Sequence, residues 1–442
     1  MESIVSARTL GRPTSMFPQR YKDPSIGEWF VTPRHLREGP VKPARERPVP
    51  AAEDLNPWHS EIGTQPSLHL DEEIALHNEP IATESTQTMA SAAEPFIAFA
   101  SLHRGEPAPD WLSRQIISAW GLDPARTVLS LIAVSENATF RIEVDGAPYA
   151  VLRVHRPSYV DSLQIRSELQ WVQALGEEID VSVPEVVPLT DGSLVHTFQR
   201  GAQEGAAPEE EPWHVVAFAF VQGAVLEDII GALPDPASYY RLIGEATAKF
   251  HQHADSWQRP VGFDRFQWRL EDMLWDSSRW GDWRAAEMSP QQQQTLESAE
   301  AAAVQHLNGL QPGDQGWGLI HADLRPSNIM MHEDSLTVID FDDCGYGWYL
   351  YDFAAALSFI EHEPYTPQIA REWLAGYQGV RSLSARDLRH ACALSMVRRL
   401  TMLGWTTTHR RDALPPAIWD AQLPGAVEVA QRYLDSPTWL VD

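Results

Sequence analysis

Alternating apolar and polar positions predict a small sheet in the middle of the chain. The segments Val128–Val134, Thr139–Val144 and Tyr149–Val154 have the length and alternation of strands. Asp145-Gly146, between the last two, is a strong signal for a two-residue hairpin turn. We therefore expect three successive antiparallel strands. Further short strands are expected at Val186–Leu189, Leu194–Phe198 and Val215–Val221.

Helical spacing of apolar residues flanks this sheet and dominates after it. Residues 111–120 have an apolar face that ends at Gly121, and a second helix is expected over residues 163–175. Helical spacing returns from residue 240 onward and is interrupted by one short hairpin at 329–340. The pattern predicts an α+β, two-lobed fold. It has a small N-terminal antiparallel sheet lobe with one helix, residues 108–222, and a larger, mostly helical C-terminal lobe, residues 223–442.

Residues 1–89 have a different character. Glycine and proline interrupt them, and no apolar period survives over the length of a helix. Residues 51–89 contain eight acidic residues and no Lys or Arg, so we expect a disordered tail. Two alternatives stay open. Residues 3–22, which carry Ser and Arg but no acid, could be a transit peptide, and translation could start at Met89.

The charge balance narrows the function. Among 442 residues, 34 Lys and Arg stand against 61 Asp and Glu, a net charge of −27. Such a surface repels polyanions, so we expect neither nucleic-acid binding nor attachment to anionic membranes. The longest apolar run, residues 215–221, is far shorter than the roughly 20 residues that span a bilayer. The two cysteines, Cys344 and Cys392, indicate a reducing cytoplasm.

The strongest chemical signal is the segment His321-Ala-Asp323 followed by Asn328, and then Asp340. Pro326 excludes a helix interior, so Asp323 and Asn328 are expected on a loop. Asn328 and Asp340 each lie six residues from Asp334, the centre of the predicted turn, so the hairpin should place them side by side at its open end. An amide and a carboxylate oxygen are ligands suited to Mg²⁺.

Phosphoryl transfer requires this set of groups. Its transition state spreads charge over phosphoryl oxygens, so catalysis depends on metal neutralisation, alignment and a proton acceptor for the attacking hydroxyl. We expect Asp323 to act as the base, and Asn328 and Asp340 to bind Mg²⁺. A rival metal site, His251-x-His253, is disfavoured because residues two apart on a helix point in different directions.

These motifs resemble the aminoglycoside phosphotransferase, choline kinase and homoserine kinase superfamily, whose members are related to protein kinases. The resemblance covers roughly residues 108–435. It implies ATP-dependent phosphorylation of a hydroxyl on a small molecule or, in some relatives, on protein Ser/Thr. It also implies that His321 and Asp352 support the catalytic loop, with Asp352 capping a helix. Protein kinases have Asp-Phe-Gly where this chain has Asp340-Phe341-Asp342.

The resemblance assigns nucleotide contacts to the sheet. Ser135 and Asn137 occupy the place of the loop that covers the phosphates. The third strand ordinarily supplies a lysine, but the only lysines are Lys22, Lys42 and Lys249, and Arg153 takes that position. Glu168 is expected to be its ion-pair partner. The strand that ends near Phe220 is expected to lead to the hinge that binds the adenine edge.

Substrate contacts are expected from the helical lobe after Asp340. Asp343 and Glu361 could receive an ammonium group, and Arg398-Arg399 could bind a carboxylate. A solvated face explains these charges equally well. The full set of substrate candidates is Asp343, Glu361, His362, Arg398, Trp405 and His409.

Three functions remain open. The first is an ATP-dependent phosphotransferase acting on an amino-alcohol, aminoglycoside or hydroxy-amino acid, as a monomer or homodimer. The second is a protein Ser/Thr kinase. The third is a nucleotide-binding pseudokinase scaffold, which the missing lysine and the long tail would favour.

Overall fold

The computed structural model describes residues 97–99, 101–135, 137–157, 159–200, 211–333, 335–409, 414 and 416–442. All of them fall within one compact unit. The predicted tail, residues 1–89, lies outside the described residues. Within the described part, no helix is long and apolar enough to cross a membrane.

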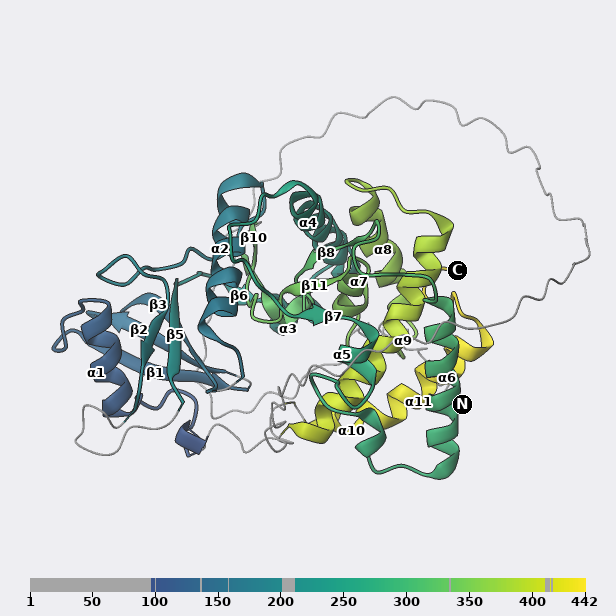
Figure 1. Ribbon diagram of the computed structural model, residues 1–442, viewed down its shortest axis with the longest axis horizontal. Coiled ribbons are helices and arrows are strands. Elements are labelled where there is room, and N and C mark those ends of the chain that lie inside the picture. The colour runs from purple at the N-terminus through teal and green to yellow at the C-terminus, as the bar shows by residue number, and fades with distance from the viewer. Residues whose placement is uncertain are drawn as a thin grey trace, which may run out of the picture. The chain divides into compact units, whose positions relative to one another are not determined.

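The small sheet has five strands in the order β1-β2-β3-β5-β4, each antiparallel to its neighbour (Figure 1). The predicted hairpin is present, and Asp145 and Gly146 have φ values of 53° and 74°, as a two-residue turn requires. The strand expected at Val186–Leu189 is reduced to a single bridge from Val186 to Phe218. The strands are β1 (Thr127–Val134), β2 (Ala138–Val144), β3 (Ala147–His155), β4 (His196–Phe198) and β5 (Trp213–Ala219).

Two helices accompany the sheet and belong to different cores. Helix α1 (Asp110–Ala119) buries Leu112 and Ile116 against sheet residues such as Phe140. Helix α2 (Ser162–Glu178) begins at Asp161, whose side chain accepts two backbone N–H groups, and its apolar residues join the core of the helical part instead. Because α2 packs on the helical part while the sheet uses α1, α2 lies where the two cores meet.

The helical part contains two small sheets besides its helices. The predicted hairpin forms β9 (Ile329–His332) and β10 (Ser335–Val338), and β6 (Ala224–Val225) adds to β9. A second sheet, in the order β7-β11-β8, was not predicted, because its strands β7 (Gln267–Trp268), β8 (Trp317–Ile320) and β11 (Gly345–Trp348) are too short for a pattern. The helices are α3 (Leu226–Ile229), α4 (Pro236–Ser256), α5 (Leu270–Leu274), α6 (Pro290–His306), α7 (Tyr351–Ala356), α8 (Thr366–Gln378), α9 (Ala385–Thr408), α10 (Pro416–Asp420) and α11 (Gln422–Asp435). Short 3₁₀ turns are η1 (Ile97–Phe99), η2 (Ile230–Ala232), η3 (Trp283–Ala285) and η4 (Pro326–Asn328).

The chain changes sheets between Ala219, the end of β5, and Ala224, the start of β6. Gly223 has φ of 127°, and a Cβ there would lie 2.3 Å from the carbonyl oxygen of Met331. Only glycine permits so close an approach in this conformation. The predicted lobe boundary at residues 222 and 223 remains our proposal.

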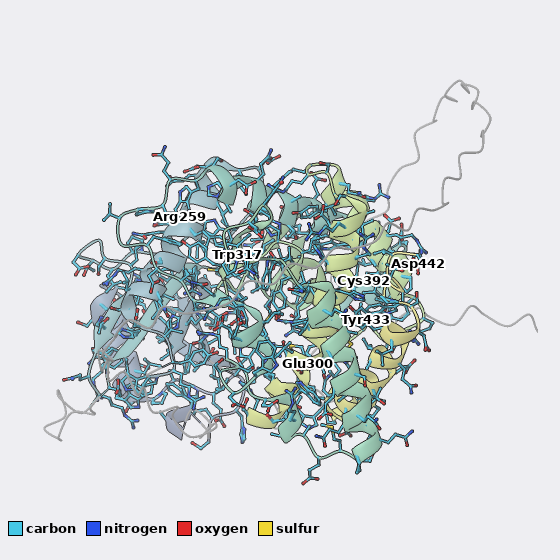
Figure 2. The ribbon with its side chains drawn as sticks, turned by 45° about the vertical axis from the view of Figure 1, so that its right-hand side comes forward. Arg259, Glu300, Trp317, Cys392, Tyr433 and Asp442 are labelled. Carbon is cyan, nitrogen blue, oxygen red and sulfur yellow. The ribbon has the colours of Figure 1, made fainter. Side chains whose placement is uncertain are left out.

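Buried polar contacts fix the helices around the core of the helical part. Glu300 of α6 accepts hydrogen bonds from the indole N–H groups of Trp275 and Trp283 and pairs with Arg284. Helix α6 also packs on α11, where Tyr433 lies 2.6 Å from Nδ1 of His306. Figure 2 labels Glu300 and Tyr433 on these neighbouring helices. These contacts join α6 to the segment that leads from α5 into η3, and to α11.

Candidate active site

The buried carboxylate of Asp352 fixes the loop that carries Asp323. It accepts the backbone N–H groups of His321 and Ala322 at 3.0 and 2.6 Å, and Nε2 of His251 lies 3.0 Å away. Ala322 has φ of 66°, a conformation that residues with a Cβ adopt at a cost. Two donors converging on one carboxylate hold this strained turn. Asp352 thus braces the loop backbone directly, in correction of the expectation that it does so by capping a helix.

The side chain of His321 joins this loop to the hairpin. Its Nε2 lies 3.1 Å from the carbonyl oxygen of Ile339, and the backbone N–H of Asp323 donates to its Nδ1 at 3.4 Å. The ring lies against Phe341, with centroids 4.6 Å apart. The expected support by His321 is therefore seen as a bridge between the two segments that carry the candidate catalytic and metal-binding residues.

The hairpin places Asn328 and Asp340 near its open end. The pairing of its two strands differs by one residue from the prediction. Ser335, expected in the turn, pairs with His332 and begins β10. Ile339, and not Asp340, therefore lies opposite Asn328, and its N–H donates to the Asn328 carbonyl at 2.9 Å. Asp340, an expected metal ligand, follows this pair with φ of 66°. A two-residue turn closes the hairpin where the symmetric count assumed a longer one.

Asn328 also binds the candidate base. Its Nδ2 donates to both the backbone oxygen and Oδ2 of Asp323, each at 2.8 Å. The other amide atom, Oδ1, lies 3.5 Å from the hydroxyl of Ser327, and it is the atom that the sequence analysis expects to bind the metal. Asp323 thus contacts Asn328, and Asp340 directly follows Ile339, which pairs with Asn328. The negative charge of Asp323 also contributes to the raised pKa of Asp340.

Arg153 and Glu168 form the predicted buried ion pair. Nη2 of Arg153 donates to Oε1 of Glu168, and Nη1 of Arg153 lies 3.5 Å from Oδ1 of Asp340. Burial alone would lower the pKa of Arg153, but the negative charges of Glu168, Asp342 and Asp340 outweigh it and raise that pKa. Arg153 therefore stays charged and links Glu168 of α2 to Asp340.

Asp342 is the main site residue that the sequence analysis did not select. Desolvation and the negative charge of Asp342 raise the pKa of the Asp340 carboxyl, although the Asp340 side chain remains 48% exposed. Arg153 opposes this shift only in part. The carboxyls of Asp340 and Asp342 therefore repel each other unless a cation or a proton lies between them. The signal was present in the sequence, since Asp342 stands two residues after Asp340 in the same motif.

The expected phosphate-covering turn reaches the same carboxylate. The N–H of Ser135 donates to the carbonyl of Asn137 at 2.9 Å, which shapes the turn between β1 and β2. The Nδ2 of the buried Asn137 donates to Oδ2 of Asp342 at 2.6 Å. The turn is thereby tied to the segment that follows Asp340.

Arg265 also holds the segment that follows Asp340. No pattern in the sequence indicated this role. Its guanidinium donates to the carbonyls of Asp342, Cys344 (2.6 Å) and Gln164 (3.0 Å). Because Gln164 lies on α2, this one side chain ties α2 to the segment that follows Asp340.

Phe220 directly follows β5, the strand that is expected to lead to the hinge. Its N–H donates to the carbonyl of Tyr149 at 3.3 Å, and the guanidinium of Arg141 lies 5.2 Å from its ring centre. That N–H is therefore engaged by the sheet. Adenine recognition by the hinge backbone would fall to groups beyond it.

Two of the predicted substrate residues are not available to a substrate. Arg398 is fully buried and pairs with Asp323, and Glu361 is fully buried in an ion pair with Arg399 at 3.0 Å. Both expectations were wrong, because an isolated charge would be costly inside the core and each of these is matched to a partner there. The sequence showed the charges but not their partners.

The other substrate candidates are distributed around the helical part. Asp343 is partly exposed, and its carbonyl accepts the indole N–H of Trp268 at 2.9 Å. Trp405 is nearly buried and stacks on His409, with ring centroids 4.1 Å apart. His362 lies 3.6 Å from Glu363. Of these, Asp343 adjoins the motif residues directly.

His251 serves the loop and not a metal pair. Besides Asp352, its ring contacts the hydroxyl of Tyr377 at 2.9 Å, while Nε2 of His253 lies 3.2 Å from the carboxylate of Glu178. Among the described residues, no group of three His, Cys, Asp or Glu side chains could hold a metal by itself. A metal at Asn328 and Asp340 would therefore need further ligands from a bound molecule or water.

A family model for the phosphotransferase enzyme family matches residues 129–389, more than half of the chain. The chain belongs to this family. Homoserine kinase of Rhizobium meliloti (strain 1021) is 27% identical over 306 residues, which cover 68% of this chain and 82% of that protein. Amicoumacin kinase of Bacillus subtilis (strain 168) is 23% identical over 249 residues, 53% of this chain. That match spans 64% of the amicoumacin kinase, less than two thirds of its length.

Solved phosphotransferases share the fold. A microcompartment-associated aminopropanol kinase superposes with a TM-score of 0.64 and 36% identity, covering 74% of this chain and 98% of that one. An amicoumacin kinase in complex with AMP-PNP and Ca²⁺ superposes with a TM-score of 0.57 at 18% identity, covering 75% of this chain and 95% of that one. The family's kinases act on small molecules, and the α+β, kinase-like fold expected from the sequence is confirmed.

Proposed function

We propose that this chain transfers the γ-phosphoryl group of ATP to the hydroxyl of a small amino-alcohol. The observation that carries the proposal is the contact of Asn328 with Asp323, beside Asp340. The contact supports the proposal because Asp323, as a proton acceptor, would then lie next to oxygen ligands for Mg²⁺. Asp323 would accept the proton of the attacking hydroxyl as the oxygen–phosphorus bond forms.

The residues at the metal position fit Mg²⁺. Asn328 Oδ1, Asp340 and Asp342 offer hard oxygen ligands, and the mutual repulsion of the two carboxyls would be relieved by a divalent cation. Mg²⁺ bound there would neutralise charge on the phosphoryl oxygens. The protein supplies few ligands, which suits a metal that keeps waters and shares the phosphates of the nucleotide.

Arg153 would bind the phosphates in place of the usual lysine. Its permanent charge and forked donors suit phosphate oxygens, and Glu168 holds it in orientation. Ser135 and Asn137 would cover the phosphates from the sheet, with Asn137 releasing Asp342 to do so. The arrangement favours a working enzyme over a pseudokinase scaffold, because a forked cation stands in the place of the missing lysine.

The acceptor class rests on the relatives. The aminopropanol kinase is 36% identical and is covered over 98% of its length, and homoserine kinases also phosphorylate an alcohol that carries an amino group. Asp343 is the partly exposed carboxylate that adjoins the motif, and it would receive the substrate ammonium. We therefore place amino-alcohols before aminoglycosides.

The test is a screen of the full chain with Mg-ATP. Candidate acceptors are aminopropanol, ethanolamine, homoserine, an aminoglycoside and a generic protein, with ADP release and the mass of the product as readouts. We expect acceptor-dependent ADP release and a phosphorylated amino-alcohol. Asp323→Asn should lower kcat by roughly 10² or more at unchanged Mg-ATP affinity. Asp276→Asn, at an exposed position, is the matched control.

Two outcomes would contradict the proposal. Equal background activity in wild type and Asp323→Asn, with Mg-ATP still bound, would indicate the scaffold. Phosphorylation of the protein substrate alone would indicate a protein kinase.

A further inference from the structure

Arg398 of α9 is a fully buried cation whose contacts converge on the catalytic loop. Its Nη2 donates to Oδ1 of Asp323 at 2.5 Å, and its Nη1 to the carbonyl of Ala322 at 3.2 Å. Nη1 also reaches the hydroxyl of Tyr351 at 3.3 Å, and Nε donates to the hydroxyl of Ser358 at 3.0 Å. Nitrogens at every corner of the guanidinium are thus used, and two of the contacts belong to the loop itself.

Aromatic rings hold this guanidinium on its faces. Its central carbon lies 4.9 Å from the ring centre of Trp280 and 5.5 Å from that of Tyr351. Cation–π contacts of this kind offset part of the cost of burying a charge. The guanidinium therefore has little freedom to move, and neither does the carboxylate that it contacts.

The two carboxylate oxygens of Asp323 accept hydrogen bonds from different parts of the chain. Asn328 and Arg325, both on the loop, donate to Oδ2 at 2.8 and 3.3 Å, while Arg398 holds Oδ1 from a distant helix. A carboxylate with donors on both oxygens cannot rotate about its terminal bond without losing one set. Its side chain is nonetheless 15% exposed, so part of it stays open to an acceptor hydroxyl.

We infer that Arg398 is a positioning residue for the proposed base: from α9 it fixes the plane of the Asp323 carboxylate for proton transfer from the acceptor hydroxyl. The inference rests on the proposed phosphotransfer. Arg398 lies beyond residues 129–389, the part of the chain that matches the family model. Helix α9 begins within the matched residues, but Arg398 lies after their end, so the inference extends the site beyond them.

The neighbouring Arg399 provides a matched control. It is equally buried and lies on the same helix, but it pairs with Glu361 and donates to the carbonyls of Ala421 and Gln422. Loss of either guanidinium should reduce folding stability. Only the loss of Arg398 should also affect the base.

The experiment compares Arg398→Lys with Arg399→Lys in the full chain. Lysine keeps the charge but cannot bridge Asp323, Ala322 and Ser358 at once. We expect Arg398→Lys to lower kcat by roughly 10- to 100-fold, with Mg-ATP affinity and acceptor KM within about twofold. Arg399→Lys should lower the melting temperature without a comparable loss of kcat. A second variant, Arg398→Ala, should regain kcat on addition of guanidinium at millimolar concentration, and Arg399→Ala should not.

The outcomes separate the two claims. If wild type transfers phosphate to no acceptor, the proposed function fails and this inference fails with it. If wild type is active and Arg398→Lys keeps its kcat, the inference alone is overturned. Equal losses of kcat in both lysine variants, or the absence of guanidinium rescue in Arg398→Ala, would assign Arg398 to folding only and would also overturn it.

Discussion

The side-chain amide of Asn328 donates to Oδ2 of Asp323 at 2.8 Å, so one residue contacts the candidate base and faces the candidate metal position. The same nitrogen also holds the backbone carbonyl of Asp323. Orientation of the base and binding of the metal therefore depend on a single side chain, and the two roles can be separated by substitution.

Asn328→Asp should separate them. The variant keeps an oxygen for Mg²⁺ but has no N–H to donate, and it places a second carboxylate beside Asp323. We expect Mg²⁺ to be bound at least as tightly, while kcat falls by roughly tenfold or more. Titration of Mg²⁺ against Mg-ATP turnover measures both quantities. A variant with weaker Mg²⁺ binding and normal kcat would contradict this division of roles.

Arg153 should tolerate lysine better than a neutral residue. Arg153→Lys keeps a cation beside Glu168 and Asp340 but loses the fork, so Mg-ATP affinity should fall by only a few-fold. In Arg153→Met, the affinity for Mg-ATP should fall by roughly tenfold or more, because Glu168 would then be buried without its partner. Calorimetric titration with Mg-AMP-PNP measures the affinity. Equal affinities in wild type and Arg153→Met would exclude contact with the phosphates.

Asp352→Asn should destabilise the fold. The carboxylate accepts two backbone N–H groups and contacts His251, and an amide cannot accept all three without turning its own donor toward them. We expect a loss of about 1–3 kcal/mol in the free energy of unfolding, measured in urea. Asp276→Asn, at an exposed position, should leave stability nearly unchanged. A stable Asp352→Asn variant would show that the strained loop does not need this brace.

His155 should make stability fall at mildly acidic pH. Burial and the positive charge of Arg153 lower the pKa of His155 well below 6.5, and both ring nitrogens are buried without a hydrogen-bond partner. As the pH falls, the His155 side chain therefore takes up a proton at a higher pH in the unfolded chain than in the folded one. The contribution of His155 to stability is fully present above about pH 6.5 and is lost as the pH falls below that value. In His155→Leu the slope of unfolding free energy against pH should be shallower by up to about 1.4 kcal/mol per pH unit. Other buried histidines keep some slope in both proteins, so identical slopes would contradict the prediction.

The sequence predicted most of the small sheet because its signals are local. Alternation and the Asp145-Gly146 turn define the β2–β3 hairpin within a few residues. The hairpin at Ile329–Val338 was also predicted, but its register was one residue out, because a symmetric count cannot distinguish turns of different length. Strands β7 and β11 were missed, since two to four residues carry no period.

The order of residue types along the chain was enough to group Asp323, Asn328 and Asp340, because a loop and a hairpin bring near neighbours together. The resemblance to the phosphotransferase superfamily was needed to pair Arg153 with Glu168. The order of residue types could not show that Arg398 and Glu361 point inward, that Asp342 joins Asp340, or that Arg265 ties α2 to the site. The fate of a charge depends on which partner the folded chain brings to it, and for these residues only the packing of distant elements supplies that partner.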